Sequence, residues 1–221
     1  MTYLSLLKEH KIIRQLSLLQ FIAYFGAWFS SVAIYTMLVE FGSSAFAISM
    51  VTVMHLLPAV VIAPISGAII DRFKIKPLML TLLSIELVMT LFLLTIDDKS
   101  EVWILMILVF VRMAAASAFF STEMSLLPKI ISGKALQKTN EIHSIIWSFT
   151  YAVGMGLSGV VVHYYGTQTA IIIDALIFVT AILVFLKIDF KVEIIHTKEK
   201  ILDMIKDGFL YIIYSSENTF G

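Results

Sequence analysis

Three charged residues lie inside apolar stretches of about 20 residues, the length that spans a bilayer as a helix: Glu86, Arg112 and Asp174. A charge at the centre of a bilayer costs at least about 2.5–3.5 kcal/mol, so each of them needs a partner. At a rise of about 1.5 Å per residue, Glu86 and Arg112 lie at similar depth near mid-membrane, and we predict that they form an ion pair. The alternative is a role in proton coupling. Asp174 is expected about 10 Å from one face, hydrated there and structural.

A second set of side chains shares one face of the first apolar stretch. These residues are polar or aromatic and follow one another at helical spacing of three or four: Gln20, Tyr24, Trp28, Ser31 and Tyr35. Such a face suits a cavity for a bulky amphipathic substrate, and ordinary packing between helices explains it nearly as well. His55, in the second stretch, could titrate near neutral pH, although a lone histidine is more often hydrogen-bonded to a neighbouring helix.

Six apolar stretches position these residues. We predict membrane-spanning helices over Leu16–Val39, Ala45–Ile70, Pro77–Ile96, Val102–Ser121, Ile142–His163 and Thr167–Leu186. The breaks between them are polar, the longest being Thr122–Glu141, and consecutive helices are expected to run antiparallel. Pro58 and Pro64 free backbone groups in the second helix and permit it to bend. The ten-residue alternating pattern of a membrane β-barrel is absent, so the predicted fold is an all-α membrane bundle.

Composition indicates the same class. Hydrophobic residues make up 59% of the chain and charged residues 14%, whereas soluble domains are about half apolar and a quarter charged. The net charge is zero, which gives no basic field for nucleic acid. There is no cysteine, so disulfides, cysteine-based metal sites and thiol catalysis are excluded. The motifs of zinc proteases, serine hydrolases and ATP-driven pumps are also absent, and we expect neither an enzyme nor a cofactor.

Basic residues predict the orientation. All but two of the 16 Lys and Arg residues lie in alternate polar segments, namely residues 1–15, 71–76, 122–141 and those after 186. Positive charge marks the cytoplasmic side, so both termini are expected there. The predicted organisation is a cytoplasmic N-terminus (1–15), a six-helix bundle (16–186) and a cytoplasmic amphipathic linker (187–221). That linker either lies on the membrane surface or packs on the bundle, and the chain looks truncated before a seventh helix.

The segment Gly67–Lys76, between the second and third predicted helices, resembles motif A of the major facilitator superfamily, G-x-x-x-D-R-x-G-R-R, in letters and in location. The matching residues are Gly67, Asp71, Arg72 and Lys76. Lys74 and Ile75 replace a glycine and an arginine of the motif. The resemblance implies that Asp71 is the acid of a cytoplasmic latch between two halves of a transporter. The alternative is an ordinary charged loop that obeys the positive-inside rule.

Later segments resemble the exporter branch of this superfamily, which includes macrolide-efflux and siderophore-export proteins. They are Leu136–Asn140, Asp174–Phe178 and Asp207–Tyr211. Residues 154–159 are similar to the antiporter motif C, G-P-x-x-G-G, although Met155 and Ser158 depart from it. Close packing of helices through these small residues is an equally good explanation.

The resemblance covers the N-terminal half of such a transporter, a bundle of 3+3 inverted repeats. It implies that the first and fourth helices line the central cavity, which favours a functional Arg112 and a structural Glu86. We therefore expect a secondary transporter of the bacterial cytoplasmic membrane that exports a small amphipathic compound, such as a drug or siderophore, by proton-coupled alternating access. Its partners would be lipid, substrate, protons and a C-terminal half. The alternative is a half-size protein that acts as a homodimeric transporter or as a non-transporting scaffold.

Overall fold

The computed structural model describes residues 2–189, and of Asp71 only the backbone. Over this range the chain consists of helices and short connections. The helices are α1 Tyr3–Glu9, α2 Lys11–Glu40, α3 Ala45–Arg72, α4 Ile75–Leu93, the 3-10 turn η1 Lys99–Glu101, α5 Val102–Ile130 and α6 Gly133–Leu186. Within the described range, five helices are long and apolar enough to cross a membrane. The all-α class is confirmed for this range, whereas the predicted linker from residue 190 onward lies outside it.

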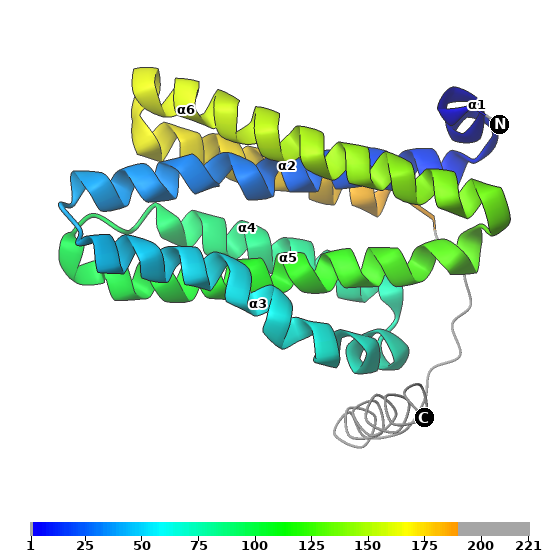
Figure 1. The fold of residues 1–221 in the computed structure, drawn as a ribbon, viewed down its shortest axis with the longest axis horizontal. Coiled ribbons are helices and arrows are strands. Elements are labelled where there is room, and N and C mark those ends of the chain that lie inside the picture. The colour runs from blue at the N-terminus through cyan, green and yellow to red at the C-terminus, as the bar shows by residue number, and fades with distance from the viewer. Residues whose placement is uncertain (1, 190–221) are drawn as a thin grey trace, which may run out of the picture.

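The helix α6 contains two of the predicted spans. A straight helix of its 54 residues would be about 80 Å long, more than twice the thickness of a bilayer core. Gly166 interrupts it with φ 82° and ψ 169°, a conformation open to glycine because it has no Cβ. Figure 1 shows the ribbon turning back at the end of the yellow part of α6. We call residues 133–165 the first arm and residues 167–186 the second arm of α6.

One predicted break is wrong. Residues 122–141 are not a polar loop, because α5 continues to Ile130 and the first arm of α6 begins at Gly133. The reason is that an apolar face persists through this segment: Leu126 and Leu127 are fully buried in the core, and Ile142 joins the same cluster. The N-terminal segment is also more regular than expected, with α1 capped by Thr2 and α2 starting at Lys11.

Helix α2 packs against α6, α3 against α5, and α4 against both α5 and α6. Two apolar clusters form the interior. The first includes Leu6, Leu16, Leu83, Leu127 and Phe185 and lies toward α1. The second includes Ile34, Leu38, Val51, Leu105 and Ile171 and lies toward the other end of the bundle. A layer of buried polar side chains separates the two clusters.

Helix α3 carries Pro58 and Pro64 in its interior. A proline inside a helix removes one backbone hydrogen bond and bends the helix. In Figure 1 the second half of α3 diverges from α5. The bend permitted by the sequence is therefore present.

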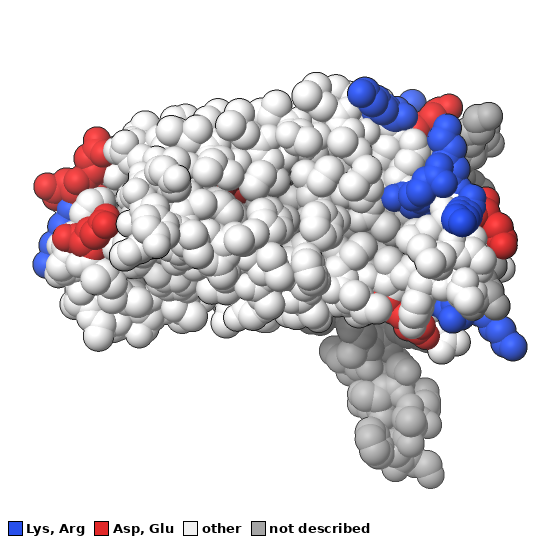
Figure 2. Space-filling view, turned by 90° about the horizontal axis from the view of Figure 1, so that it is seen from above, with Lys and Arg blue, Asp and Glu red and all other residues white. Residues whose placement is uncertain are grey.

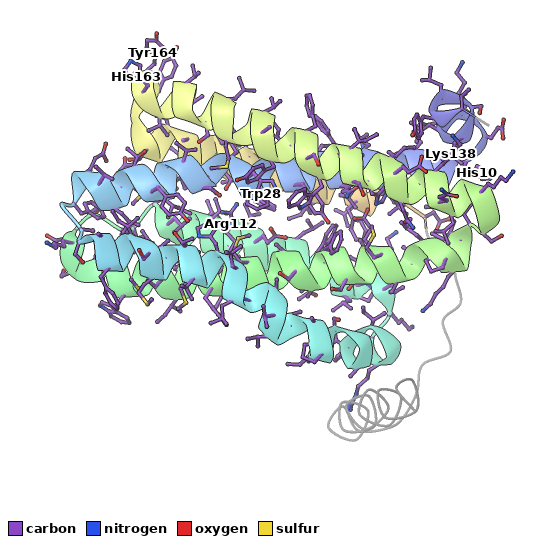
Figure 3. All side chains as sticks on the ribbon, in the orientation of Figure 1. His10, Trp28, Arg112, Lys138, His163 and Tyr164 are labelled. Carbon is purple, nitrogen blue, oxygen red and sulfur yellow. The ribbon has the colours of Figure 1, made fainter. Side chains whose placement is uncertain are left out.

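Charges gather at the two ends of the molecule. Figure 2 shows most Lys and Arg at one end, beside several acids, acids with less basic charge at the other end, and almost uncharged sides between them. Large apolar side chains are exposed in the middle of the helices, for example Val60 at 71% and Leu56 at 65%. His163 and Tyr164 mark the turn of α6, whereas His10 and Lys138 lie at the opposite, basic end (Figure 3). An uncharged apolar belt between charged ends is the surface that a bilayer requires.

Candidate functional site

Arg112 is the centre of a buried polar cluster between the two apolar clusters. Its side chain lies in the layer between α2 and α5 (Figure 3), and the residue is 1% exposed. Nη2 donates a hydrogen bond to Asp174 Oδ2 at 2.8 Å, forming an ion pair, and another to the Gly26 carbonyl oxygen at 3.2 Å. Nη1 donates to the Ser30 hydroxyl. The guanidinium also lies over the Phe178 ring, 5.4 Å from its centroid. Three helices, α2, α5 and the second arm of α6, are thus joined at Arg112.

Gly26 allows this arrangement because it has no side chain. A Cβ built at this position would lie 2.9 Å from Asp174 Oδ1, closer than real Cβ atoms approach, and 3.1 Å from Ile177 Cγ2, tighter than most real Cβ contacts. Helix α2 therefore approaches the second arm of α6 closely enough for its backbone carbonyl to reach Arg112. Gly26 was not among the residues predicted to matter. As the one glycine of the predicted span Leu16–Val39, it was the available signal.

Two expectations about these charges are corrected. Arg112 forms its ion pair with Asp174 and not with Glu86. Asp174 is not hydrated, because the second arm of α6 places it in the interior with no exposed surface. Glu86 is nevertheless buried, at 2% exposure, and lies within electrostatic reach of both Arg112 and Asp174. The cluster thus combines one buried base with two buried acids.

A second buried polar pair lies toward the basic end. Glu123 on α5 is fully buried and His143 on the first arm of α6 is 2% exposed, with 3.9 Å between His143 Nδ1 and Glu123 Oε1. Neither residue was predicted: Glu123 was assigned to a polar loop, and His143 lay at the start of the predicted span Ile142–His163 without being considered. The apolar residues around Glu123, such as Leu126 and Leu127, continue the helical periodicity of α5 and were the missed signal.

The polar-aromatic residues of α2 reach different neighbours. Gln20 Nε2 donates to the His143 carbonyl at 3.3 Å, and Tyr35 Oη lies 3.1 Å from the Thr52 hydroxyl of α3. Ser31 bonds back to its own helix, and Tyr24 is 7% exposed in the core. Packing therefore accounts for most of this face.

Trp28 belongs instead to an aromatic group at the surface. It meets Trp147 and Tyr151 of the first arm of α6 edge to face, with ring centroids 5.9 and 4.7 Å away. Trp147 and Tyr151 are 45% and 43% exposed. We call these three residues the aromatic patch. The predicted cavity role of the α2 face stays a prediction, and the aromatic patch is its accessible part.

Comparison with known proteins decides the family. The sequence profile of the Major Facilitator Superfamily matches residues 16–213. This chain belongs to the major facilitator superfamily. An uncharacterized MFS-type transporter of Bacillus subtilis (strain 168), YfiS, is 27% identical over 213 residues. The match covers 94% of this chain and 50% of that relative, so the chain spans about half the length of the curated relative it matches. The resemblance to the superfamily is confirmed, and the chain is a multi-pass membrane protein.

The residues that match motif A of the superfamily lie at the basic end. Gly67 and Arg72 are exposed, and a Cβ at Gly67 would meet nothing within 4 Å. Lys76 Nζ donates to the Ile188 carbonyl oxygen at 2.7 Å and so ties the start of α4 to the end of α6. The side chain of Asp71 lies outside the described part of the structure, and its latch role stays a prediction.

The small residues similar to motif C divide into two groups. A Cβ at Gly154 would lie 3.3 Å from the Phe25 carbonyl oxygen of α2, and Ser158 is fully buried. At Gly156 and Gly159 a Cβ would meet nothing within 4 Å. Close helix packing is thus confirmed at Gly154. Gly156 and Gly159 make no close contact within the described residues.

Proposed function

We propose that this chain is the N-terminal half of a secondary active transporter that exports a small amphipathic compound, such as a drug or siderophore, in exchange for protons. Alternating access in the cytoplasmic membrane of a bacterium would drive the cycle. The relative from Bacillus subtilis is described as an MFS-type transporter, which supports transport as the general activity. The observation that carries the coupling proposal is the buried cluster of Arg112 with Asp174 and Glu86.

The proposed topology has six spans, arranged as 3+3 inverted repeats with both termini in the cytoplasm. Supporting it, α6 turns back at Gly166, so its two arms count as separate spans. Basic residues concentrate at the end of the molecule that holds α1, the end assigned to the cytoplasm by the positive-inside rule.

The balance of charges in the Arg112 cluster favours a proton on one of its two acids. Arg112 compensates one of the two carboxylates, Asp174, with which it pairs directly. The second carboxylate, on Glu86, would be an uncompensated buried charge, which is costly in an apolar interior unless it carries a proton. Loss of that proton is therefore favourable only in a conformation that hydrates the cluster or rearranges its contacts. Proton occupancy and conformation are coupled in this way.

The aromatic patch of Trp28, Trp147 and Tyr151 supports an amphipathic substrate. Flat aromatic side chains with polar edges bind apolar rings and cations. The patch is half-exposed on this chain, and in the proposed transporter a second half would close a cavity over it.

The coupling proposal is tested with the intact transporter in proteoliposomes. Glu86→Gln and Asp174→Asn should abolish efflux driven by a proton gradient. Glu40→Gln, an exposed acid at the end of α2, is the matched control and should preserve it. Gradient-driven efflux at the wild-type rate in both cluster variants would refute the coupling role of these acids.

A further inference from the structure

Glu123 and His143 are buried with unsatisfied polar atoms. Both carboxylate oxygens of Glu123 and both ring nitrogens of His143 are buried and lack a hydrogen-bond partner among the described residues. The nearest approach between the two groups is 3.9 Å, from Nδ1 to Oε1, which is too long for a hydrogen bond. Buried polar groups in proteins are nearly always satisfied, and an exception calls for an explanation.

Two polar side chains of α2 lie near this pair. The Tyr24 hydroxyl interacts with the Gln20 side chain and electrostatically with both Glu123 and Glu86. Gln20 donates to the His143 carbonyl, while its own Oε1 is unsatisfied. No Lys or Arg side chain of the described residues forms an ion pair with Glu123. Among residues 2–189, His143 is therefore the base in position to neutralise it.

The depth of the pair differs from that of the Arg112 cluster. Glu123 lies about 30 Å along α5 from Val102, and His143 about 34 Å along the first arm from Gly166. Both therefore lie at the basic edge of a hydrocarbon layer that is about 30 Å thick. Arg112 is about 15 Å along α5 from Val102. The pair is thus near one membrane surface and the Arg112 cluster is near the middle, with Tyr24 within reach of acids in both.

We propose that Glu123 and His143 form a proton-binding site at the cytoplasmic edge of this half, which exchanges protons between the cytoplasm and the Arg112 cluster past Tyr24. With one proton the pair is neutral overall, as imidazolium with carboxylate or as imidazole with carboxylic acid. Release of that proton to water leaves neutral imidazole and a buried carboxylate, which is costly while the site is closed. Release therefore requires the basic end of the bundle to open.

Binding of the proton follows from the described residues alone, whereas its use in transport rests on the proposed function. The two are tested separately. Proton binding is measured on the 221-residue chain purified in detergent, by infrared difference spectroscopy of protonated carboxyl groups during a pH titration. Glu123→Gln should remove one titrating carboxyl signal. Glu9→Gln, an exposed acid of α1 at the same end, should leave the buried-carboxyl signals unchanged.

A second readout covers the case in which Glu123→Gln does not fold. In the wild-type chain labelled with 15N-histidine, the His143 resonance, assigned by its loss in His143→Gln, should change over the same pH range as a buried carboxyl signal. A carboxyl spectrum that is unaltered by Glu123→Gln, found together with a His143 resonance that stays constant throughout the titration, would overturn the proposal.

The role in transport is tested in the intact transporter. Glu123→Gln should slow proton-driven efflux at least tenfold and remove its dependence on cytoplasmic pH, while substrate exchange without a gradient persists. Wild-type efflux that is unaffected by any proton gradient would refute the proposed function and leave the proton site standing. Gradient-driven efflux with unchanged pH dependence in Glu123→Gln would refute the transport role of the site alone.

Discussion

At the scale of single residues, the absence of a side chain at Gly26 determines which charged residue lies beside Arg112. The 2.9 Å distance from a Gly26 Cβ to Asp174 Oδ1 means that the second arm of α6 approaches α2 only because residue 26 is glycine. Glu86 and Arg112 are both deeply buried in the bundle, and their predicted depth near mid-membrane stays a prediction. Depth along a helix can be read from residue counts. Which neighbouring helix a side chain faces depends on packing and was not predictable from them.

Replacement of Gly26 should therefore disturb the cluster. Gly26→Ala places a methyl group against Asp174 and should lower the stability of the protein by about 1–3 kcal/mol, the usual effect of overpacking. Gly156→Ala is the control, because its Cβ would enter open space. The measurement is the thermal unfolding midpoint of the purified protein in detergent. Equal midpoints for the two variants would contradict the close approach at Gly26.

The partner of Arg112 can be identified by double-mutant cycles. Arg112→Gln combined with Asp174→Asn should show a coupling free energy of several kcal/mol, because removing one member of a buried ion pair costs about 3–5 kcal/mol and removing both costs less. The cycle of Arg112→Gln with Glu86→Gln should give a smaller value, since no direct contact joins these residues. Stability in denaturant measures both cycles. A larger coupling to Glu86 would favour the pairing predicted from sequence.

At the scale of helices, the sequence indicated where apolar segments lie more reliably than where helices end. Spans were predicted where α2, α3, α4 and α5 form, and the turn near Gly166 coincides with a predicted break. The segment 122–141 was predicted to be a loop because it contains many polar residues. The helical periodicity of its apolar residues was not considered. Its buried face includes Glu123, so the error in the helix boundary concealed a candidate site.

The turn of α6 gives a prediction at this scale. Gly166 has φ 82° and ψ 169°, a region that is essentially restricted to glycine and that a residue with a Cβ adopts at a cost of about 1–3 kcal/mol. Gly166→Ala should lower the thermal unfolding midpoint for this reason. Gly159→Ala, by contrast, should leave the midpoint unchanged or raise it, because residue 159 lies within a helix and its Cβ would enter open space. A midpoint in Gly166→Ala at or above that of Gly159→Ala would show that the turn does not depend on this conformation.

At the scale of the whole molecule, composition and charge distribution were sufficient to predict a membrane bundle, and the family match bears this out. They were not sufficient to identify a substrate. In the proposed transporter a substrate cavity has walls from two halves, and the chain spans about half the length of its relative. The aromatic patch also depends on contacts between α2 and the first arm of α6, which a one-dimensional pattern does not contain.

We expect that residues 1–221 alone do not transport, because in the proposed transporter the cavity needs walls from two halves. Vesicles that contain only this chain should show dye efflux driven by a proton gradient no faster than protein-free vesicles. Vesicles with an intact exporter of the same superfamily are the positive control. Efflux clearly above the protein-free rate would support the alternative of a homodimeric half-size transporter.

The two apolar clusters on either side of the Arg112 layer have a consequence for its access to solvent. The cluster around Ile34, Leu105 and Ile171 fills the bundle between that layer and the acidic end. Water and ions do not enter such a packed apolar region, so no polar path leads from the Arg112 layer to the acidic end of the bundle. The described bundle thus separates the charged groups at its centre from the solvent at its acidic end.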